Sequence, residues 1–228
     1  MIGIIGAMRI EVEALKEAMK NVTVETVSGV EFIRGTLCGK EVVVAQCGIG
    51  KVFAAICAQT MILKYKPTCV INTGVAGTLT SELGILNLAI STAVVQHDMD
   101  TSAIGDPVGL ISGINKVELP ASKPLCDRLA EAADRMGLKH REGVIASGDL
   151  FVNDPTKKAW ITETFGAIAC EMEGAAVGHV CYVNGVDFAI LRAISDNASG
   201  EADMEYPEMA AKAAKLSQAL LCDVIEHL

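Results

Sequence analysis

Clustered positive charge is missing from this sequence. Its 228 residues include 19 lysines and arginines against 28 acidic residues, which gives a net charge of -9 at pH 7. A protein that binds nucleic acid through its phosphates needs basic residues gathered in one region, so this pattern excludes a general nucleic-acid binder. Disorder is excluded as well, because 51% of the residues are hydrophobic.

Cysteine pairs of the C-x-x-C type are also absent, although the chain has eight cysteines, most of them within apolar runs. Free cysteines in such runs behave as small buried hydrophobes, and disulfide frameworks are typical of short secreted chains. The apolar runs are short, and the first six residues lack the basic region of a signal peptide. We therefore expect reduced thiols, no membrane association and a cytoplasmic location.

Motifs for metal and phosphate chemistry are absent or incomplete. The sequence has no H-E-x-x-H or G-x-S-x-G and its four histidines are scattered, so no metal site is expected. Residues 45–52 imitate a phosphate-binding P-loop, but Ala45 replaces its first glycine and Val52 replaces the Mg²⁺-binding serine or threonine. A dinucleotide fingerprint that began at Gly48 would need a third glycine where Phe53 stands.

Short apolar runs alternate with longer helical patterns along the chain. Strands are expected at residues 2–6, 31–37, 41–46, 68–73, 86–96, 143–147, 167–170 and 188–194. Helices are expected at residues 10–19, 51–64, 124–136, 156–164, 174–184 and from 207 to the C-terminus. Apolar strands that alternate with helices indicate an α/β fold whose sheet is covered on both faces. The sequence shows no repeat and no linker, so residues 1–228 are expected to form a single domain.

Acidic residues follow several expected strands, at the ends where open α/β sheets bind ligands. Glu11 lies in the first helical turn, where an isolated acid can simply complement the helix dipole. Asp196, which Ser195 can orient, fits either a contact to a heterocycle or a loop cap. Glu171 and Glu173 share a face only if the backbone between them is extended. Otherwise one of them is structural, and we favour Glu173 as the acid that faces a ligand.

Small residues and one aromatic side chain mark two further strand ends. The segment 72–77 fits either a tight turn or the close approach of a ligand to the backbone. Aromatic residues make up only 4% of the chain. Phe151, which follows a strand end at Gly148, can stack on a planar base or belong to the core.

Six segments occur together, in one order, across the chain. They are residues 3–8 (GIIGAM), 48–52 (GIGKV), 72–77 (NTGVAG), 147–151 (SGDLF), 171–173 (EME) and 192–196 (RAISD). In this combination the sequence closely resembles the bacterial 5'-methylthioadenosine/S-adenosylhomocysteine nucleosidases of the nucleoside phosphorylase superfamily. The resemblance implies one three-layer αβα domain with a central mixed β-sheet, a homodimer, a nucleoside substrate, and neither a metal nor an organic cofactor.

The resemblance also implies a role for each matching residue. Glu11 matches the acid that activates water, Asp196 the acid that protonates adenine N7, and Glu173 the acid that holds the ribose hydroxyls. The other matches are the sugar and alkylthio contacts Met8, Ile49 and Met172, the purine contacts Phe151 and Val152, and Arg192 near the water. Two pocket positions depart from some members, since Val75 replaces a serine and Tyr206 replaces a phenylalanine.

The chemistry of glycosidic cleavage explains these residue types. A negative site favours the positive charge that develops on the ribose, and a proton at N7 relieves the leaving adenine. We expect burial to raise the pKa of Asp196, and the helix N-terminus to help keep Glu11 ionised. Such a pair predicts hydrolysis of an N-glycosidic bond. The resemblance implies that the substrates are methylthioadenosine and S-adenosylhomocysteine, and we expect 5'-deoxyadenosine to be cleaved as well.

Two other functions remain open. A phosphorylase on the same fold would need cations that converge on phosphate. Arg9, Lys51 and Arg192 lie near the relevant strand ends, but Glu11 among them would repel phosphate. An inactive nucleoside sensor would be expected to lack one of the three acids, and all three are present. Hydrolysis is therefore preferred.

Two segments, 97–116 and 197–206, lack a regular pattern, and such loops commonly form a site or an interface. The first is unusually apolar, and exposing it would leave an apolar patch. We expect a twofold partner to cover this segment, with Ile104 completing the 5' end of the neighbouring pocket.

Overall fold

The computed structural model of the chain describes residues 1–196 and 206–227, with side chains in the second range from residue 208 onward. Of the segment 197–206, which was expected to form part of a site or interface, residues 197–205 and the side chain of Tyr206 lie outside the described part.

Ten strands form one sheet in the described part of the chain. They are β1 (Ile2–Gly6), β2 (Lys20–Val27), β3 (Val30–Leu37), β4 (Lys40–Gln46), β5 (Cys69–Thr78), β6 (Leu88–Gln96), β7 (Leu119–Pro120), β8 (His140–Ser147), β9 (Ala167–Glu171) and β10 (Asp187–Asp196). The helices within the same ranges are α1 (Arg9–Ala18), α2 (Lys51–Tyr65), α3 (Lys123–Arg135), α4 (Pro155–Phe165), α5 (Gly174–Asn184) and α6 (Tyr206–His227).

The sheet is mixed, and part of it closes on itself. β1 lies between β4 and β5 and runs parallel to both. β10 runs parallel to β5 and antiparallel to β6, while β8 pairs in parallel with β6 and β9. β9 returns to the last residues of β5, at Gly77 and Thr78. A closed ring is therefore formed by β5, β10, β6, β8 and β9, in that order. The strands β1, β4, β3 and β2 continue from β5 as an open sheet.

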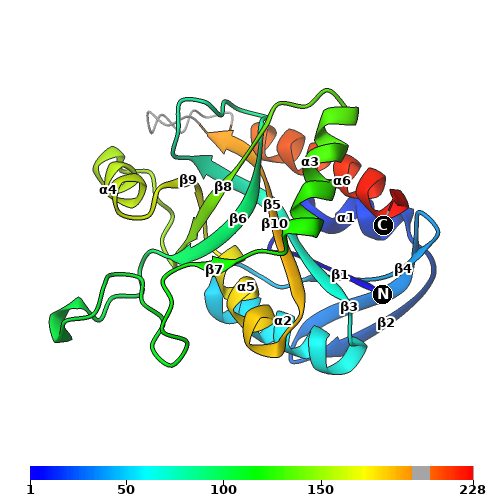
Figure 1. Cartoon of the computed structure of the whole chain (residues 1–228). Coiled ribbons are helices and arrows are strands. Elements are labelled where there is room, and N and C mark those ends of the chain that lie inside the picture. Colours follow the sequence, from blue (N-terminus) through cyan, green and yellow to red (C-terminus); the bar gives the residue numbers. More distant parts are fainter. Residues whose placement is uncertain (197–205, 228) are drawn as a thin grey trace.

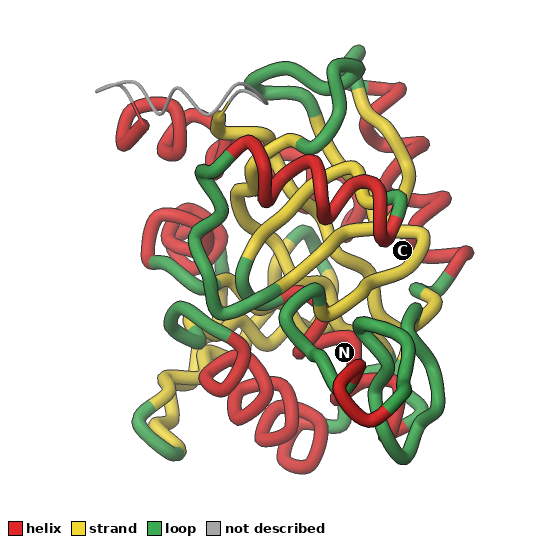
Figure 2. Tube along the Cα trace, turned by 90° about the vertical axis from the view of Figure 1, so that its left-hand side faces the viewer, coloured by secondary structure: helices red, strands yellow, loops and turns green. Residues whose placement is uncertain are grey.

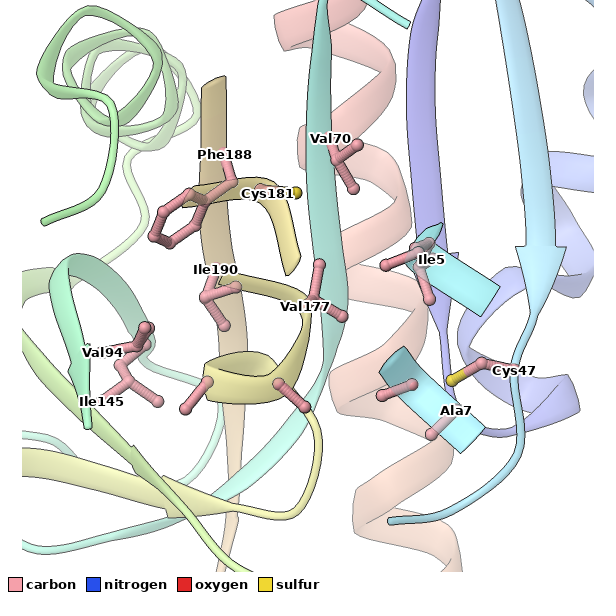
Figure 3. Close-up of a cluster of buried hydrophobic side chains, with 14 of the residues drawn as sticks. Ile5, Ala7, Cys47, Val70, Val94, Ile145, Val177, Cys181, Phe188 and Ile190 are labelled. Carbon is pink, nitrogen blue, oxygen red and sulfur yellow. The ribbon is translucent and has the colours of Figure 1, made fainter. Parts of the chain in front are cut away.

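Helices cover both faces of the sheet and create a core on each. In Figure 1, α1, α3 and α6 lie on one side and α2 and α5 on the other, and Figure 2 shows helices around the strands from a second direction. Ile5 packs in the core that Figure 3 shows, with Val177 of α5 and Phe188 of β10. Its neighbour Ile4 packs in the opposite core with Leu15 of α1. Successive strand residues face opposite sides, so a strand between two helical layers is apolar at every position.

The expected three-layer fold is confirmed, and the predicted helices and strands are present with ends shifted by a few residues. The predicted end of one strand at Gly74 is wrong, because β5 continues to Thr78. Gly74 and Gly77 pair with Arg192 and Asp196 of β10, so the segment is strand rather than a tight turn. The small side chains of this segment do not form the apolar pattern that predicts a strand. Its strand conformation results from the backbone pairing with β10.

Two strands, β2 and β7, were not predicted. β2 is exposed along almost its whole length, so its sequence lacks the alternation of a half-buried strand. Its antiparallel pairing with β3 at the edge of the sheet makes it a strand. No helix in the described ranges is long and apolar enough to cross a membrane.

The segment 97–116 extends away from the layers, in green in Figure 1. It contains a 3-10 helix at Ser102–Ile104 and an isolated bridge between Ile111 and Lys116. Ile111 is buried, whereas 81% of Ile104 is exposed. The segment therefore has some internal packing of its own, but Ile104 has no cover within this chain's described part.

Candidate active site

A pocket opens where the carboxyl ends of β1, β8, β9 and β10 meet the second half of β5. Its lining residues are Ala7, Met8, Glu11, Ile49, Val75, Ala76, Gly77, Leu150, Phe151, Val152, Cys170, Glu171, Met172, Glu173, Ser195 and Asp196. Segments far apart in the sequence meet here because the ring of strands brings their ends together.

Glu11 is fixed beside this pocket by backbone N–H groups. It is the third residue of α1, and its Oε2 accepts hydrogen bonds from the N–H groups of Ala7 and Met8, both at 2.8 Å. Its Oε1 accepts the N–H of Val75 at 3.0 Å. Burial raises the pKa of Glu11, although Arg192 and the three N–H groups oppose the shift. A raised pKa makes a carboxylate a better proton acceptor near neutral pH.

Arg192 lies on β10, is only 1% exposed, and forms an ion pair with Glu171. Its Nη2 also donates to Asn72 Oδ1 at 2.5 Å. Glu171 accepts further hydrogen bonds from the Ser147 hydroxyl and from two backbone N–H groups at the start of α5, at 2.9 and 2.7 Å. Burial would raise the pKa of Glu171, but the Arg192 charge and these hydrogen bonds lower it below its ordinary value. The hydrogen-bonding capacity of Glu171 is therefore largely taken up within the protein.

Glu173 directly precedes α5 and is bonded less completely. Its Oε1 accepts the N–H of Gly50 at 2.9 Å, and its Oε2 lies 3.9 Å from Arg192 Nη2. Burial and the negative charge of Glu171 raise the pKa of Glu173 to about 7, against the pull of Arg192. Glu173 therefore changes its charge near neutral pH and keeps acceptor capacity for a ligand.

Asp196 ends β10 and contacts a lysine that the sequence did not single out. Its Oδ1 accepts the N–H of Thr78 at 3.1 Å, and its Oδ2 lies 3.2 Å from Nζ of Lys158 on α4. The Lys158 side chain is 6% exposed. Ser195, which was expected to orient Asp196, instead directs its hydroxyl to the Ala76 carbonyl at 3.4 Å.

Apolar side chains complete the pocket wall. The structure brings Met8, Val75, Val152 and Met172 to the same pocket as the acids. Ile49 and Phe151 also line it, and they are 56% and 53% exposed. An apolar wall beside carboxylates suits a ligand with a polar sugar and an apolar substituent.

Two predicted site residues stand apart from this pocket. Arg192 does not line it and instead bonds Glu171 behind the wall. Ile104 does not line the pocket of its own chain. The prediction for Tyr206 falls outside the described side chains.

Several pocket residues were missed by sequence reasoning. Ala7, Leu150 and Cys170 gave no sign of a ligand contact, so only the tertiary structure places them there. Ala76 and Gly77 belong to the segment 72–77, for which the close approach of a ligand was one of two alternatives, and they line the pocket. Lys158 gave no signal either, because a lysine in a helical pattern is typical of a solvated face. Within the described ranges, no three His, Cys, Asp or Glu side chains group in a way that could hold a metal ion.

Known proteins with this fold identify the class of the chain. A family model described as the phosphorylase superfamily matches residues 1–226. The chain therefore belongs to the phosphorylase superfamily, and its relatives place it within the family of 5'-methylthioadenosine/S-adenosylhomocysteine nucleosidases.

Two curated relatives and two solved structures support this placement. The nucleosidases of that name from Shewanella halifaxensis and Shewanella sp. strain W3-18-1 are 39% and 41% identical, over all of this chain and 99% of theirs. The Neisseria meningitidis nucleosidase, solved with methylthio-immucillin-A, has a TM-score of 0.95 at 34% identity, covering 100% of this chain and 99% of that chain. A Helicobacter pylori futalosine hydrolase has a TM-score of 0.94 at 37% identity, covering 100% and 97%.

Replacing Glu171 by Gln is expected to lower the free energy of unfolding by about 3–5 kcal/mol. Arg192 would keep its buried charge but lose the carboxylate that compensates it. Denaturant unfolding at pH 7 measures the loss.

Glu173→Gln is the matched control, because the same chemical change falls on an acid that is farther from Arg192. Ionisation of Glu173 costs stability as the pH rises from its ordinary pKa of 4.5 through its folded value of about 7. The control should therefore gain stability relative to the unmodified protein across that range. Equal losses for the two variants at pH 7 would contradict the division into a structural and a ligand-facing acid.

Proposed function

We propose that this chain hydrolyses the N-glycosidic bond of 5'-methylthioadenosine and S-adenosylhomocysteine, and also that of 5'-deoxyadenosine. The products are adenine and the 5-substituted ribose. The observation that carries the proposal is the presence of Glu11, Glu173 and Asp196 around one pocket. The names of the curated relatives support the substrate class.

Each acid has a separate task in this reaction. The C1'–N9 bond breaks, its electron pair leaves with adenine, and N7 takes a proton from Asp196. Water adds to C1' while Glu11 takes one of its protons, and Glu173 accepts hydrogen bonds from the ribose hydroxyls. The negative carboxylates favour the positive charge that develops on the sugar. The Lys158 ammonium lies where it can stabilise the carboxylate that Asp196 becomes after it gives up its proton.

Hydrolysis is preferred to phosphorolysis because nearby cations already have carboxylate partners. Arg9 pairs with Glu13, and Lys51 pairs with Asp98. Arg192 is buried against Glu171. A phosphate group would need several of these cations to converge on it, and Glu11 would repel it.

Futalosine is a second candidate substrate, since a solved futalosine hydrolase shares the fold at 37% identity. The test is release of the free base from methylthioadenosine, S-adenosylhomocysteine, 5'-deoxyadenosine and futalosine, with and without phosphate. We expect adenine release from the first three at a rate that phosphate does not change. Formation of ribose-1-phosphate products, or the absence of adenine release, would contradict the proposal.

Replacing either Asp196 or Glu11 by its amide is expected to reduce turnover by about 10²–10⁴-fold. Asp196→Asn keeps the shape of the side chain but lacks the proton for N7, and Glu11→Gln cannot take a proton from water. Glu11→Gln should still bind a stable substrate analogue, whereas Glu173→Gln should bind it more weakly. Steady-state kinetics and calorimetric titration measure both effects. Near-normal turnover of Asp196→Asn would disprove its assignment as the acid.

Exposed apolar side chains support a homodimer as the working form. Ile104 is 81% exposed, and α2 carries Val52, Phe53 and Leu63, each more than half exposed. Val183 adds a further exposed apolar group on α5, which packs against α2. Apolar side chains of this number at a surface are typical of an interface. We propose that a second copy covers them and that its Ile104 completes the neighbouring pocket.

Ile104→Asp is expected to convert the dimer to a monomer and to raise KM for thioether substrates, because the charge would be buried between subunits. Val24→Asp on β2 is the matched control, since it places the same charge on an apolar residue that is 56% exposed at the far edge of the sheet. Mass in solution and KM are measured together. A folded, fully active monomer would rule out the shared pocket.

A further inference from the structure

Three charged residues from separate segments form a closed set of contacts beside the pocket. Asp98 follows β6, and its Oδ1 accepts from Nζ of Lys51 at 2.6 Å. Its Oδ2 accepts the backbone N–H of Asp149 at 2.8 Å. The side chain of Asp149 in turn accepts the backbone N–H of Lys51, the first residue of α2, at 2.7 Å. We call Lys51, Asp98 and Asp149 the Asp98 clasp.

The clasp joins two loops that each contribute residues to the pocket wall. The loop before Lys51 contains Ile49, which lines the pocket, and Gly50, whose N–H binds Glu173 at 2.9 Å. The loop that contains Asp149 also contains Phe151, two residues further on. The clasp therefore links the residue expected to stack on the base with the residues expected to hold the sugar.

Burial does little to fix the pocket-lining residues of these two loops, so contacts between the loops are important for their positions. Ile49 and Phe151 are each more than half exposed. Gly48 and Gly50 have positive φ angles of 94° and 99°, which only glycine adopts without strain, and neither residue has a side chain that could anchor the loop.

Within the clasp, Asp149 is exposed, whereas the Lys51–Asp98 ion pair is partly buried. The Lys51 and Asp98 side chains are 18% and 30% exposed. Burial would raise the pKa of Asp98, but the hydrogen bonds from Lys51 and Asp149 and the Lys51 charge lower it overall. The lysine of the P-loop-like segment is thus occupied by an internal carboxylate, and Asp149 takes the N-terminus of α2.

We propose that Asp98 is a positioning residue, which sets the spacing between the Ile49 loop and the Phe151 loop through Lys51 and Asp149. Asp98 does not line the pocket, so it acts on the ligand only through these neighbours. The inference rests on the proposed function for the identity of the substrate. Because Ile49 and Phe151 hold the substrate but transfer no proton, loss of the clasp affects binding more than the chemical step.

Asp98→Asn tests the proposal in the full-length protein with methylthioadenosine as substrate. We expect KM to rise about tenfold and kcat to change by less than about threefold, since displacement of binding groups by about 1 Å can cost up to 10²-fold. Lys51→Met should also raise KM, and the double variant should raise it by less than the product of the two single effects, because both changes remove the Lys51–Asp98 ion pair. An unchanged KM, additive effects, or a fall in kcat alone would overturn the proposal.

Glu41→Gln is the control, because it breaks an ion pair with Arg34 at 2.9 Å in the β3–β4 hairpin. Its KM should match that of the unmodified protein, and a rise like that of Asp98→Asn would overturn the specific role of the clasp.

Backbone hydrogen exchange provides a second readout that does not depend on activity. Asp98→Asn should accelerate exchange in residues 47–53 and 148–153 together, whereas Glu41→Gln should leave both segments unchanged. Faster exchange in only one segment would overturn the proposed link between the loops. If the unmodified protein releases no adenine, the proposed function fails, while the exchange result still decides whether the clasp joins the loops.

Discussion

The guanidinium of Arg192 is a positive charge buried inside a protein of net charge -9, and three carboxylates lie around it. Glu171 neutralises it directly, while Glu173 and Glu11 feel its charge at longer range. Without a buried cation, three acids in so small a volume would repel one another and remain protonated. The negative character of the pocket therefore depends on a residue that does not line it.

The environments of these acids differ because the backbone around each one differs. Glu171 receives an arginine, a hydroxyl and two N–H groups, so it stays ionised. Glu173 receives one N–H, and its pKa rises to about 7. Glu11 receives three N–H groups but is buried, and its pKa rises as well. Acids with separate protonation behaviour in one pocket are what acid–base catalysis requires.

The closed ring of strands explains how so few residues build this arrangement. Arg192 on β10 reaches Asn72 on β5 and Glu171 on β9 because these strands are neighbours through the ring. Gly74 on β5 lies between Arg192 and Glu11, and any side chain there would collide with both. Position 74 is therefore a glycine because the side chains of Arg192 and Glu11 approach its backbone closely, and not because the chain turns there.

Much of the fold follows from the sequence alone. Continuous apolar runs such as Ile2–Gly6 specify strands buried on both faces, and helical periodicity places most of the helices, because burial of apolar surface drives both patterns. The ordered set of short motifs also pointed to the family and to Glu11, Glu173 and Asp196. The strand β2 escaped prediction because it has no buried face, and the continuation of β5 escaped because small residues carry no periodic signal.

Only the tertiary structure decided how the charged residues are paired. The sequence left open which of Glu171 and Glu173 is structural, and in the tertiary structure it is Glu171 that pairs with Arg192. It placed Arg192 in the pocket, and it assigned no role to Lys158 or Asp98. Burial and periodicity are local properties that neighbouring residues reveal. The partner of a charge is instead set by strands and loops that lie far apart in the chain, and no local pattern records which of them will meet.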